Sequence, residues 1–463
     1  MAFKTRFAPS PTGNIHLGNT RTALFCYLSA LKATGTFMLR IEDTDRERSR
    51  PEYEESLQQD LLWLGLTWNE GPNHDQGNGP YYQAARQPLY DAYYQKLEAN
   101  GHAYPCFCQE AELTIMRKLQ RARGEPPRYP GTCRHLTADQ IAAKCAAGLT
   151  PTLRFHVPDD ITVSFTDLVH GEQHIAGREM GDFIIRRTDG TPPFLFCNAI
   201  DDALMGVTLV LRGEDHLSNT PRQLLILDAL QLPRPDYAHI ALIVGFDGAP
   251  LSKRNGSQSI HTLRETGYLP IAINNYLARL GHSFEGEQLL SLPQLAQHFD
   301  LHRLSKSPAR FDEQQLQHWQ QEAVLRLSEP EWWAWVGTHV YNQVPADKHK
   351  AFFETLHPNI RFPHTILPWL DICFSKQWRA PTLTAPAGYF DCVCEIYKTN
   401  GPELPTLIQA LKTTLGIQGK SLYEPLRMAL TGQPHGPELG KLLQLMEPTL
   451  IAHRLTHART LTT

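Results

Sequence analysis

The segment that most constrains this chain is residues 5–19, TRFAPSPTGNIHLGN. A strand-like run ends there, and after PSPTG a helix-like run opens with His16, Gly18 and Asn19. Backbone N–H groups at a helix N-terminus attract anions, and Gly13 and Gly18 let a ligand approach without a Cβ in the way. The segment therefore predicts a site for a nucleotide phosphate at the start of the first helix.

A second loop, FDGAPLSKRNG at 246–256, carries basic residues between glycines and could clamp the same triphosphate from the far side. The two segments together resemble the two signatures of class I aminoacyl-tRNA synthetases. The resemblance narrows to the glutamyl-tRNA synthetase family through five stretches: RFAPSPTG at 6–13, LRIEDTDRERSRPEYEESLQQDLLWLGL at 39–66, GPYYQAAR at 79–86, DDALMGVTLVLRGEDHLSNTPRQ at 201–223 and GYLPIAINNYLARLGHS at 267–283. It is close through about residue 320 and thinner beyond.

Strand-like and helix-like runs alternate in the first hundred residues, which predicts an α/β fold with a parallel sheet and ligands at the carboxyl ends of its strands. Helices are expected over 20–35 and 52–64. The sheet is expected to resume with FLFCNAIDDALM at 194–205, VTLVLRG at 207–213 and HIALIVGFDG at 239–248. This path would bring His16 and Lys253 together.

The family resemblance implies a class I Rossmann-like parallel sheet with a zinc-containing insertion, followed by an all-helical C-terminal anticodon-binding region. The expected domains are the two halves of the catalytic domain at 1–104 and 191–254, the acceptor-binding insertion at 105–190, a stem-contact helical domain at 255–320 and the anticodon-binding domain at 321–463. TLRFHVP and ITVSFTD are expected to be strands of the insertion itself.

Composition sets only broad limits. A chain of 463 residues exceeds what one hydrophobic core usually covers. A net charge of −4 argues against a nonspecific polyanion binder, so a tRNA partner requires a locally basic face. The sequence contains no long apolar run and no signal-peptide pattern, so we expect a cytoplasmic protein without a membrane partner. The expected oligomeric state is a monomer.

The nine cysteines are expected to be thiols or metal ligands. Cys106-Phe-Cys108 and, further along, Cys133-Arg-His135 offer three thiolates and one imidazole, a set that suits tetrahedral Zn²⁺. Four protein ligands leave no open position, so one such ion would be structural and would stabilise the insertion. The alternative is a group of buried free thiols. The pair Cys392-Val-Cys394 has no CxH partner nearby and is expected to be packed thiols.

For the nucleotide, the resemblance implies ATP with Mg²⁺ and gives catalytic roles to His16, Ser252, Lys253 and Arg254. It assigns ATP contacts to Pro9, Thr12, Gly13, His16, Gly18, Asn19, Leu251 and Lys253. His16 would meet the nucleotide and its α-phosphate, and Lys253 the β and γ oxygens. Two residues depart from the family pattern: Asn19 ends the first signature, and Pro250 replaces the usual first lysine of the second.

A glutamate substrate carries two carboxylates and one ammonium, and the planar fork of arginine pairs with a carboxylate in bidentate fashion. The resemblance implies that substrate contacts come from Arg6, Ser10, Glu42, Phe194, Asn198, Arg212 and His216. Simpler alternatives are an ion pair of Arg212 with Glu214 or Asp215, and a salt bridge of Glu42 within IEDTDR. Phe194 is a further departure, because the family commonly has tyrosine there.

In the last third, WWAW at 332–335 is expected to be helix core rather than a platform for bases. An ungapped comparison of TLHPNIRFPHTIL at 355–367 with the family places Arg361 near an arginine that reads the anticodon.

The function implied by the resemblance is ATP-dependent ligation of L-glutamate to tRNA(Glu) through a glutamyl-adenylate. One alternative is an enzyme that charges tRNA(Gln), alone or in addition. Another is a synthetase-like protein that modifies or binds tRNA, and the roughly 140 residues after 321 weigh against it because tRNA-modifying relatives lack the anticodon-binding part.

Overall fold

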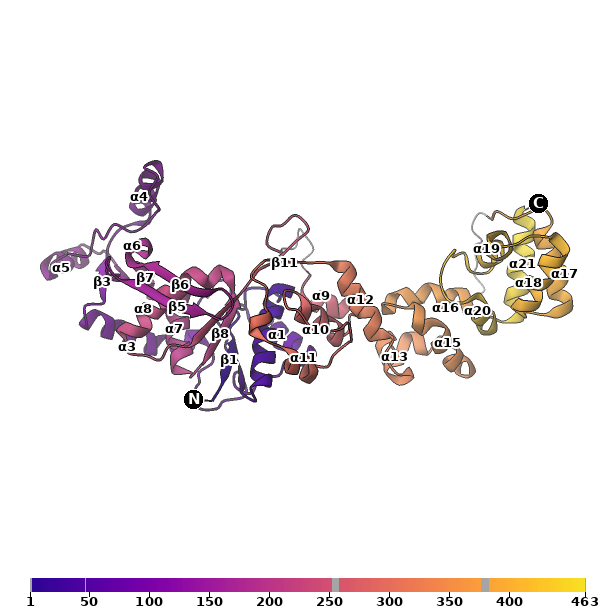
Figure 1. Cartoon of the computed structure of the whole chain (residues 1–463), viewed down its shortest axis with the longest axis horizontal. Helices are drawn as coiled ribbons and strands as arrows, with labels where there is room; N and C mark the ends of the chain where they lie inside the picture. Colours follow the sequence, from indigo (N-terminus) through magenta and orange to yellow (C-terminus); the bar gives the residue numbers. More distant parts are fainter. Residues whose placement is uncertain (1, 46, 252–257, 376–382, 463) are drawn as a thin grey trace. The chain divides into compact units, whose positions relative to one another are not determined.

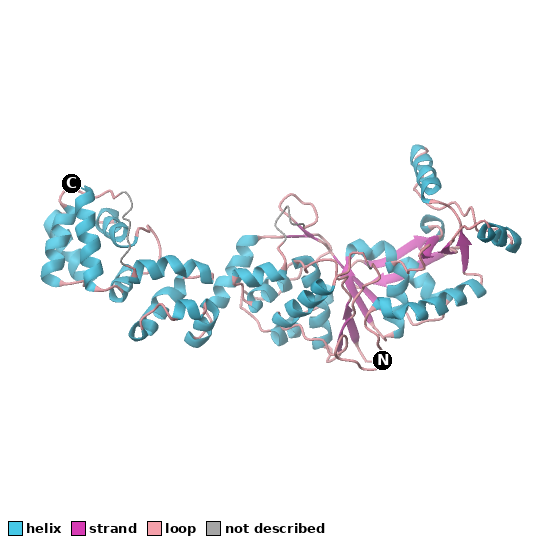
Figure 2. Cartoon of the chain, turned by 180° about the vertical axis from the view of Figure 1, so that it is seen from behind, coloured by secondary structure: helices cyan, strands magenta, loops and turns pink. Residues whose placement is uncertain are grey.

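The computed structural model describes residues 2–45, 47–251, 258–375 and 383–462. The chain divides into two compact units, one of residues 1–262 and 273–313 and the other of residues 263–272 and 314–463. Every strand of the described residues belongs to the first unit, and the second is helical (Figures 1 and 2). This separation of an α/β region from a helical one agrees with the predicted fold class.

The first unit is organised around a six-stranded sheet in the order β2-β1-β8-β9-β5-β6. The first five strands run parallel to their neighbours, and β6 pairs antiparallel with β5. The bounds are β1 Lys4–Phe7, β2 Thr36–Leu39, β5 Thr162–Asp167, β6 Gly171–Ala176, β8 Leu209–Gly213 and β9 Asp236–Ile240. The predicted parallel sheet is confirmed.

Helices pack onto this sheet where the sequence alternation predicts them. Helix α1 (Leu17–Lys32) contacts β1, β2 and β8 and buries an apolar stripe against them. Helix α2 (Pro51–Trp63) begins with a proline, whose fixed φ suits the first turn, and carries Glu52 and Glu54 near its positive N-terminal end. Helices α3 (Gln87–Ala99), α6 (Gly177–Met180) and α8 (Thr220–Ala229) also belong to the first unit.

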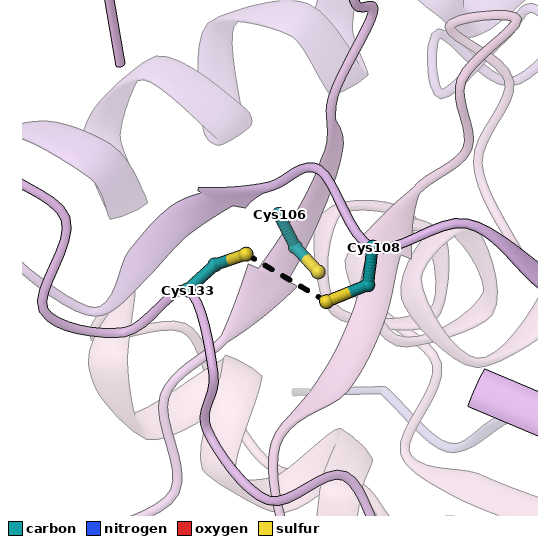
Figure 3. Close-up of side chains that lie close together, drawn as sticks. All are labelled: Cys106, Cys108 and Cys133. Atoms are coloured by element: carbon teal, nitrogen blue, oxygen red, sulfur yellow. Dashed lines mark hydrogen bonds between the residues drawn. The ribbon is translucent and has the colours of Figure 1, made fainter. Parts of the chain in front are cut away.

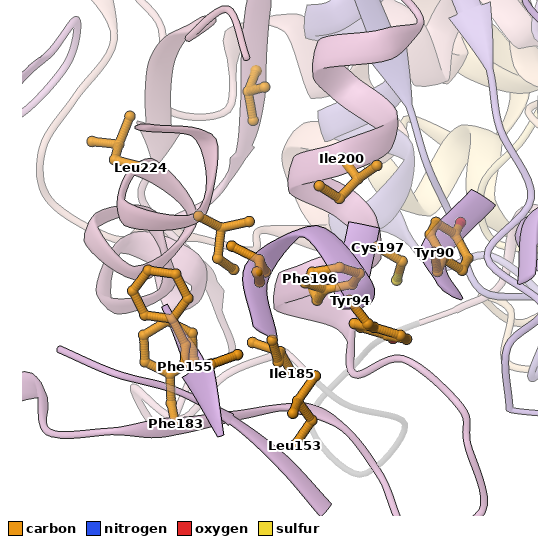
Figure 4. Close-up of a cluster of buried hydrophobic side chains, with 14 of the residues drawn as sticks. Tyr90, Tyr94, Leu153, Phe155, Phe183, Ile185, Phe196, Cys197, Ile200 and Leu224 are labelled. Atoms are coloured by element: carbon orange, nitrogen blue, oxygen red, sulfur yellow. The ribbon is translucent and has the colours of Figure 1, made fainter. Parts of the chain in front are cut away.

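The segment FLFCNAIDDALM was predicted to be a strand, and that prediction is wrong: it forms helix α7 (Phe194–Leu204). Most of its residues are buried, so its apolar run lacks the one-sided pattern of a surface helix, and a short apolar run alone does not separate a buried helix from a buried strand. Figure 4 shows Phe196 and Ile200 of α7 in the core, where Phe196 stacks on Tyr94 of α3 with ring centroids 4.5 Å apart.

The insertion contains an antiparallel sheet of β3 (Ala103–Cys106), β4 (Thr152–Phe155) and β7 (Phe183–Arg186) and the helices α4 (Glu110–Ala122) and α5 (Ala138–Ala146). TLRFHVP supplies β4, as expected. ITVSFTD does not belong to this small sheet: it forms β5, which pairs with β9 in the central sheet. The insertion is therefore joined to the six-stranded sheet through a shared strand.

The rest of the chain is mostly helical. The first unit also includes helix α11 (Leu292–His298) and a short parallel pair of β10 (Ile243–Val244) and β11 (Ala309–Arg310), and two helices follow the second loop, α9 (Ile260–Thr266) and α10 (Pro270–Arg279). The helices after residue 312 are α12 Glu313–Val324, α13 Glu329–Val336, α14 Thr338–Tyr341, α15 His349–Leu356, α16 Leu367–Phe374, α17 Tyr389–Asn400, α18 Leu404–Leu415, α19 Lys420–Thr431, α20 Leu439–Leu445 and α21 Pro448–Thr462.

The tryptophan cluster lies in the core of the second unit, as predicted. Trp332 and Trp333 of α13 are buried and pack with Phe352 of α15. Cys394 of α17 is buried in a second core of the same unit, which agrees with packed thiols. Among the described helices, none has the length and hydropathy needed to cross a bilayer.

Candidate active site

A cavity of about 600 Å³ opens in the first unit, among residues of β1 and β8, the first turn of α1 and the start of α7. Every described residue that was predicted to contact ATP or glutamate lines it: Arg6, Pro9, Ser10, Thr12, Gly13, His16, Gly18, Asn19, Glu42, Phe194, Asn198, Arg212, His216 and Leu251. Ligands of open α/β sheets bind at the carboxyl ends of the strands, and this cavity has that position.

The nucleotide side of the cavity consists of the loop after β1 and the first turn of α1. His16 is the N-cap residue, and its carbonyl oxygen accepts a hydrogen bond from the Thr20 N–H at 2.9 Å. A Cβ built on Gly13 or on Gly18 would meet no atom within 4 Å. The backbone at both glycines is therefore open to a ligand, as the anion-site prediction requires.

The second loop adjoins this side through both of its flanks. Leu251 lines the cavity, and its N–H donates to the Ile243 carbonyl oxygen at 2.8 Å. On the other flank, Ser259 forms a β-bridge with His16, and the Ile260 N–H donates to the Ile15 carbonyl oxygen at 3.0 Å. Ser252, Lys253 and Arg254 lie outside the described residues.

The opposite side of the cavity, which we call the glutamate side, carries buried charges. Arg6 of β1 donates from Nε to Oδ1 of Asp202 at 3.0 Å, and Arg40 donates to the same oxygen at 2.7 Å. Burial alone would raise the pKa of Asp202, but the two guanidiniums outweigh it and lower this pKa. Asp202 therefore stays ionised and fixes the Arg6 side chain at the cavity wall.

Glu42 follows β2 and is almost completely buried. Its carboxylate accepts a hydrogen bond from the Asn198 side-chain amide and lies 3.6 Å from a guanidinium nitrogen of Arg40. This ion pair differs from the salt bridge considered within IEDTDR, whose cation would be Arg46, and Arg46 lies outside the described residues. Burial raises the pKa of Glu42 to about 7, although Arg40 and Arg6 oppose the shift. A carboxylate with such a pKa gains from a cationic partner, and a substrate ammonium would supply one.

Arg212, near the end of β8, is held by neutral groups rather than by a carboxylate. Its Nε donates to Nε2 of His239 at 3.1 Å, and its Nη2 donates to Thr220 Oγ1 at 2.8 Å and to Gln223 Oε1 at 2.7 Å. Its Nη1 is buried and has no hydrogen-bond partner among the described residues. Burial lowers the pKa of Arg212 to about 10, so the guanidinium is still charged at neutral pH.

The alternative partners Glu214 and Asp215 do not neutralise Arg212: in the described part of the chain neither forms an ion pair with it. His216 of the short helix η2 (Glu214–Asn219) packs against Phe194, with ring centroids 4.8 Å apart. Burial lowers the pKa of His216, so its ring is neutral at physiological pH. The glutamate side thus presents an unneutralised arginine beside an aromatic wall.

A second cluster lies in the insertion. The sulfur atoms of Cys106, Cys108 and Cys133 point toward one another and lie within 4.8 Å of each other (Figure 3). The Sγ atoms of Cys108 and Cys133 are 3.7 Å apart. Two sulfurs on a tetrahedral zinc at Zn–S distances of about 2.3 Å would be about 3.8 Å apart. The three thiols therefore fit one zinc ion.

His135 is not part of this cluster: its side chain is exposed, and neither of its ring nitrogens lies within reach of the three sulfurs. The fourth group at the cluster is the Tyr129 hydroxyl, 3.4 Å from Cys106 Sγ and 3.6 Å from Cys108 Sγ. The sequence prediction missed Tyr129 because the usual zinc donors are cysteine, histidine and carboxylates.

Comparison with known proteins identifies the family. Residues 2–318 match the family described as tRNA synthetases class I (E and Q), catalytic domain, and residues 395–459 match an anticodon binding domain. The chain is 55% identical over 461 residues to glutamate–tRNA ligase 1 of Coxiella burnetii (strain CbuG_Q212), with 98% of this chain and 99% of the relative covered. This chain belongs to the glutamyl-tRNA synthetase family.

Other members of the family agree over the whole length. Glutamate–tRNA ligase 2 of Nitrosococcus oceani is 53% identical, with 98% of each chain covered. The crystal structure of the glutamate-tRNA synthetase from Elizabethkingia anophelis superimposes with a TM-score of 0.86 at 27% identity and covers 100% of both chains. The glutamate tRNA ligase of Elizabethkingia meningosepticum, solved in complex with its amino acid, has a TM-score of 0.85 at 26% identity, with 99% of each chain covered.

The role of Arg361 in reading the anticodon remains a prediction. Its side chain is exposed and donates to Gln317 Oε1 at 2.9 Å. It lies outside residues 395–459, the segment that matches the anticodon binding domain.

The sequence prediction also missed the residues that hold the arginines of the glutamate side. These are Asp202 at Arg6, with Arg40 as a second partner of Asp202, and Thr220, Gln223 and His239 at Arg212. A signal was present in the sequence, because each is a polar residue within or beside an apolar run, as in DDALM and HIALIV. Buried polar residues of this kind need partners, and here the partners are the two arginines that line the cavity.

Proposed function

We propose that this chain activates L-glutamate with ATP and Mg²⁺ and transfers the glutamyl group to tRNA(Glu). The observation that carries the proposal is one cavity that joins an open helix N-terminus to a buried, unneutralised arginine and a buried carboxylate. The first suits a triphosphate, and the other two suit the carboxylate and the ammonium of an amino acid. A metal-bound triphosphate and an acidic amino acid are the two substrates that a glutamyl-adenylate requires.

In this proposal the protein mainly positions the reactants. The α-carboxylate of glutamate attacks the α-phosphorus of ATP in line with the leaving pyrophosphate, so orientation and charge neutralisation supply most of the rate. The first turn of α1 and His16, which line the cavity, are proposed to bind the α-phosphate. Ser252, Lys253 and Arg254 are proposed to meet the β and γ oxygens, supported by the position of Leu251 and Ser259 on either side of them.

Selection of glutamate over glutamine is proposed to come from Arg212. Arg212 lines the cavity, and its buried Nη1 has no hydrogen-bond partner among the described residues. A guanidinium N–H can only donate, so a carboxylate would satisfy it, whereas the neutral amide of glutamine leaves the buried charge unneutralised. Glu42, with Asn198 beside it, is proposed to receive the α-ammonium. Ser10 lines the same wall and is proposed to contact the amino-acid backbone.

The tRNA acceptor end is proposed to bind the insertion. A cavity of about 530 Å³ next to the cysteine cluster is lined by five arginines: Arg117, Arg128, Arg154, Arg187 and Arg222. This is the locally basic surface that a chain of net charge −4 needs for a polyanion. The helical residues after 321 are proposed to bind the anticodon, with Arg361 as one reader, and the enzyme is proposed to act as a cytoplasmic monomer.

One structural zinc ion is proposed for Cys106, Cys108 and Cys133, with the Tyr129 hydroxyl as the fourth donor. Zinc in a closed site of this kind stabilises the fold around it and does no chemistry on substrate. Purified protein should contain about one zinc per chain, as a single closed site requires. Cys133→Ser and Tyr129→Phe should lower the zinc content, and His135→Ala should not. If Tyr129→Phe retained zinc and His135→Ala lost it, His135 and not Tyr129 would be the fourth zinc ligand.

The experiment that tests the proposed function is charging of separated tRNA(Glu) and tRNA(Gln) isoacceptors with labelled glutamate. Charging of tRNA(Glu) alone supports the proposal as stated. Charging of tRNA(Gln), alone or in addition, would establish the alternative specificity, and Arg361→Gln should then shift the ratio of the two rates. Labelled glutamate that is stably attached to tRNA away from its 3′ end, or not attached at all, would support a tRNA-modifying or binding protein.

A further inference from the structure

Behind the glutamate side of the cavity, three neighbouring parallel strands each place one polar residue near their carboxyl end. Arg212 lies on β8, His239 is its register partner on β9, and Asp167 is the last residue of β5. Asp167 and His239 are buried, and only Arg212 lines the cavity. The three side chains therefore lie in a row, from Arg212 at the cavity wall, through His239, to Asp167 on β5, the strand that the insertion shares with the central sheet.

The hydrogen bonds along this line fix the state of His239. A guanidinium Nε can only donate, so the 3.1 Å contact from Arg212 requires a lone pair on Nε2 of His239. The proton of a neutral ring must then be on Nδ1, which lies 2.6 Å from Oδ2 of Asp167. Thr220 Oγ1, also 3.1 Å from Nε2, can donate to the same lone pair.

Asp167 is itself fixed and cannot turn away from the ring. Its Oδ1 accepts from the N–H groups of Val169 at 2.9 Å and His170 at 2.8 Å, and its Oδ2 also accepts from the His239 backbone N–H at 3.1 Å. Burial lowers the pKa of His239 to about 4, and Arg212 acts in the same direction against the opposing pull of Asp167. The ring is therefore neutral at the pH of the reaction.

We propose that Asp167 and His239 are positioning residues for glutamate recognition: Asp167 sets the His239 tautomer that holds the Nε edge of Arg212 and so leaves Arg212 Nη1 for the side-chain carboxylate of glutamate. The arrangement resembles the one in a catalytic triad, where a carboxylate orients a histidine and the histidine in turn interacts with the functional side chain. Here the side chain that the histidine contacts is a substrate-binding arginine instead of a nucleophile. This inference rests on the proposed function of Arg212.

Asp167→Asn is the smallest change that tests the tautomer. If the amide oxygen keeps the two N–H donors at Oδ1, an amide N–H faces the ring and forces the proton of His239 onto Nε2, against Arg212. The KM for glutamate should rise about tenfold or more, as expected when a hydrogen bond to a charged group is lost, while the KM for ATP stays unchanged.

A matched pair at His239 separates positioning from packing. The amide group of glutamine reaches the place of the ring's Nε2, and that of asparagine reaches only the place of Nδ1. His239→Gln, which can still accept from Arg212, should keep the glutamate KM within a few-fold of wild type, because the bond to Nε is retained. His239→Asn should raise it as much as Asp167→Asn does. Equal effects of the two substitutions would reduce His239 to a structural residue and overturn the proposal.

Two measurements keep the outcomes distinct. Glutamate binding by calorimetry is measured beside tRNA charging, and the ATP KM reports whether each variant retains a folded active site. A wild type that binds glutamate but charges no tRNA would overturn the proposed function, and the Asp167 and His239 variants would still test positioning through glutamate affinity. Unchanged glutamate affinity in Asp167→Asn, with an unchanged ATP KM, would overturn the inference itself.

Discussion

The nucleotide side and the glutamate side of the cavity are built in different ways. The nucleotide side comes largely from one continuous segment, residues 9–19, and offers backbone groups and glycines at a helix start. The glutamate side combines Arg6, Glu42 and Arg212 from three places in the sequence, each at most 5% exposed. A buried charge is costly unless other groups compensate it, so the second side needs a supporting network that the first does not.

This contrast determines what a substitution does on each side. At Gly13 and Gly18 of the nucleotide side, an added side chain should alter access for the ligand and leave the fold intact, because a Cβ there meets no atom within 4 Å. On the glutamate side, each charged residue has at least one buried polar partner, so a change alters substrate binding and the network together. Substitutions that affect only one substrate are the sharpest way to test the division.

The largest expected effect is that of Arg212→Ala. Loss of one member of a buried charge interaction costs about 2–5 kcal/mol, so kcat/KM for glutamate should fall about a hundredfold or more. The KM for ATP should stay the same, and glutamine should remain a poor substrate because nothing in the variant recognises its amide. Steady-state kinetics with each substrate in turn measures this. Arg234→Ala, an exposed arginine paired with Asp228, is the matched control and should leave both constants unchanged.

A fall in ATP affinity as large as the fall in glutamate affinity in Arg212→Ala would contradict the division of the cavity into two sides. An equal effect of Arg234→Ala would mean that general loss of positive charge, and not the position of Arg212, explains the result.

The next effect is a pH dependence confined to glutamate. The pKa of Glu42 is raised to about 7 by burial, so the carboxyl is ionised above pH 7 and protonated below it. Only the ionised form pairs with an ammonium, and the KM for glutamate should therefore rise about tenfold from pH 8 to pH 6. Steady-state kinetics across this pH range, first with glutamate varied and then with ATP varied, shows whether only the KM for glutamate depends on pH. A glutamate KM that is flat from pH 6 to 8 would show that Glu42 does not receive the ammonium.

The nucleotide side and the glutamate side also differ in how much of each could be predicted from the sequence. The nucleotide side is local: strand end, PSPTG and helix start are contiguous, and their geometry follows from helix-terminus physics. The residues of the glutamate side were assigned only through the family resemblance, because nothing in the sequence places Arg6 near Arg212. Their supports were missed altogether: Asp167 and His239 meet only because β5 of the insertion pairs with β9 of the central sheet.

The structure departs from the sequence prediction at helix α7 and in the position of His135, and each departure has a specific cause. Helix α7 was predicted to be a strand because burial on nearly all sides removes the helical periodicity. His135 was predicted to be a zinc ligand because it follows Cys133 in a CxH pattern, yet the intervening Arg134 forms a bidentate pair with Asp182 and His135 faces solvent. Tyr129, four positions before Cys133, reaches the cluster instead.

Gly18→Ala tests the nucleotide side, and it should separate stability from binding. The backbone of Gly18 has no positive φ, a Cβ there meets no atom within 4 Å, and alanine favours a helix more than glycine does. The melting temperature should therefore stay the same or rise. The KM for ATP should nevertheless increase about tenfold, because a methyl-sized change in a shaped site usually has such an effect. Thermal unfolding and ATP kinetics on one preparation give both numbers, and a lower melting temperature would contradict the open site.

The smallest effect is expected from Phe194→Tyr, which restores the residue that the family commonly has. The Phe194 ring lines the cavity and packs on His216, so a hydroxyl on this ring would add a hydrogen-bonding group to the cavity wall. One recovered hydrogen bond contributes about 1 kcal/mol, so the glutamate KM should fall roughly two- to fivefold, with no change for ATP. An unchanged glutamate KM would show that another group already makes this contact, and a change shared by ATP would place Phe194 at the boundary between the two sides rather than on the glutamate side.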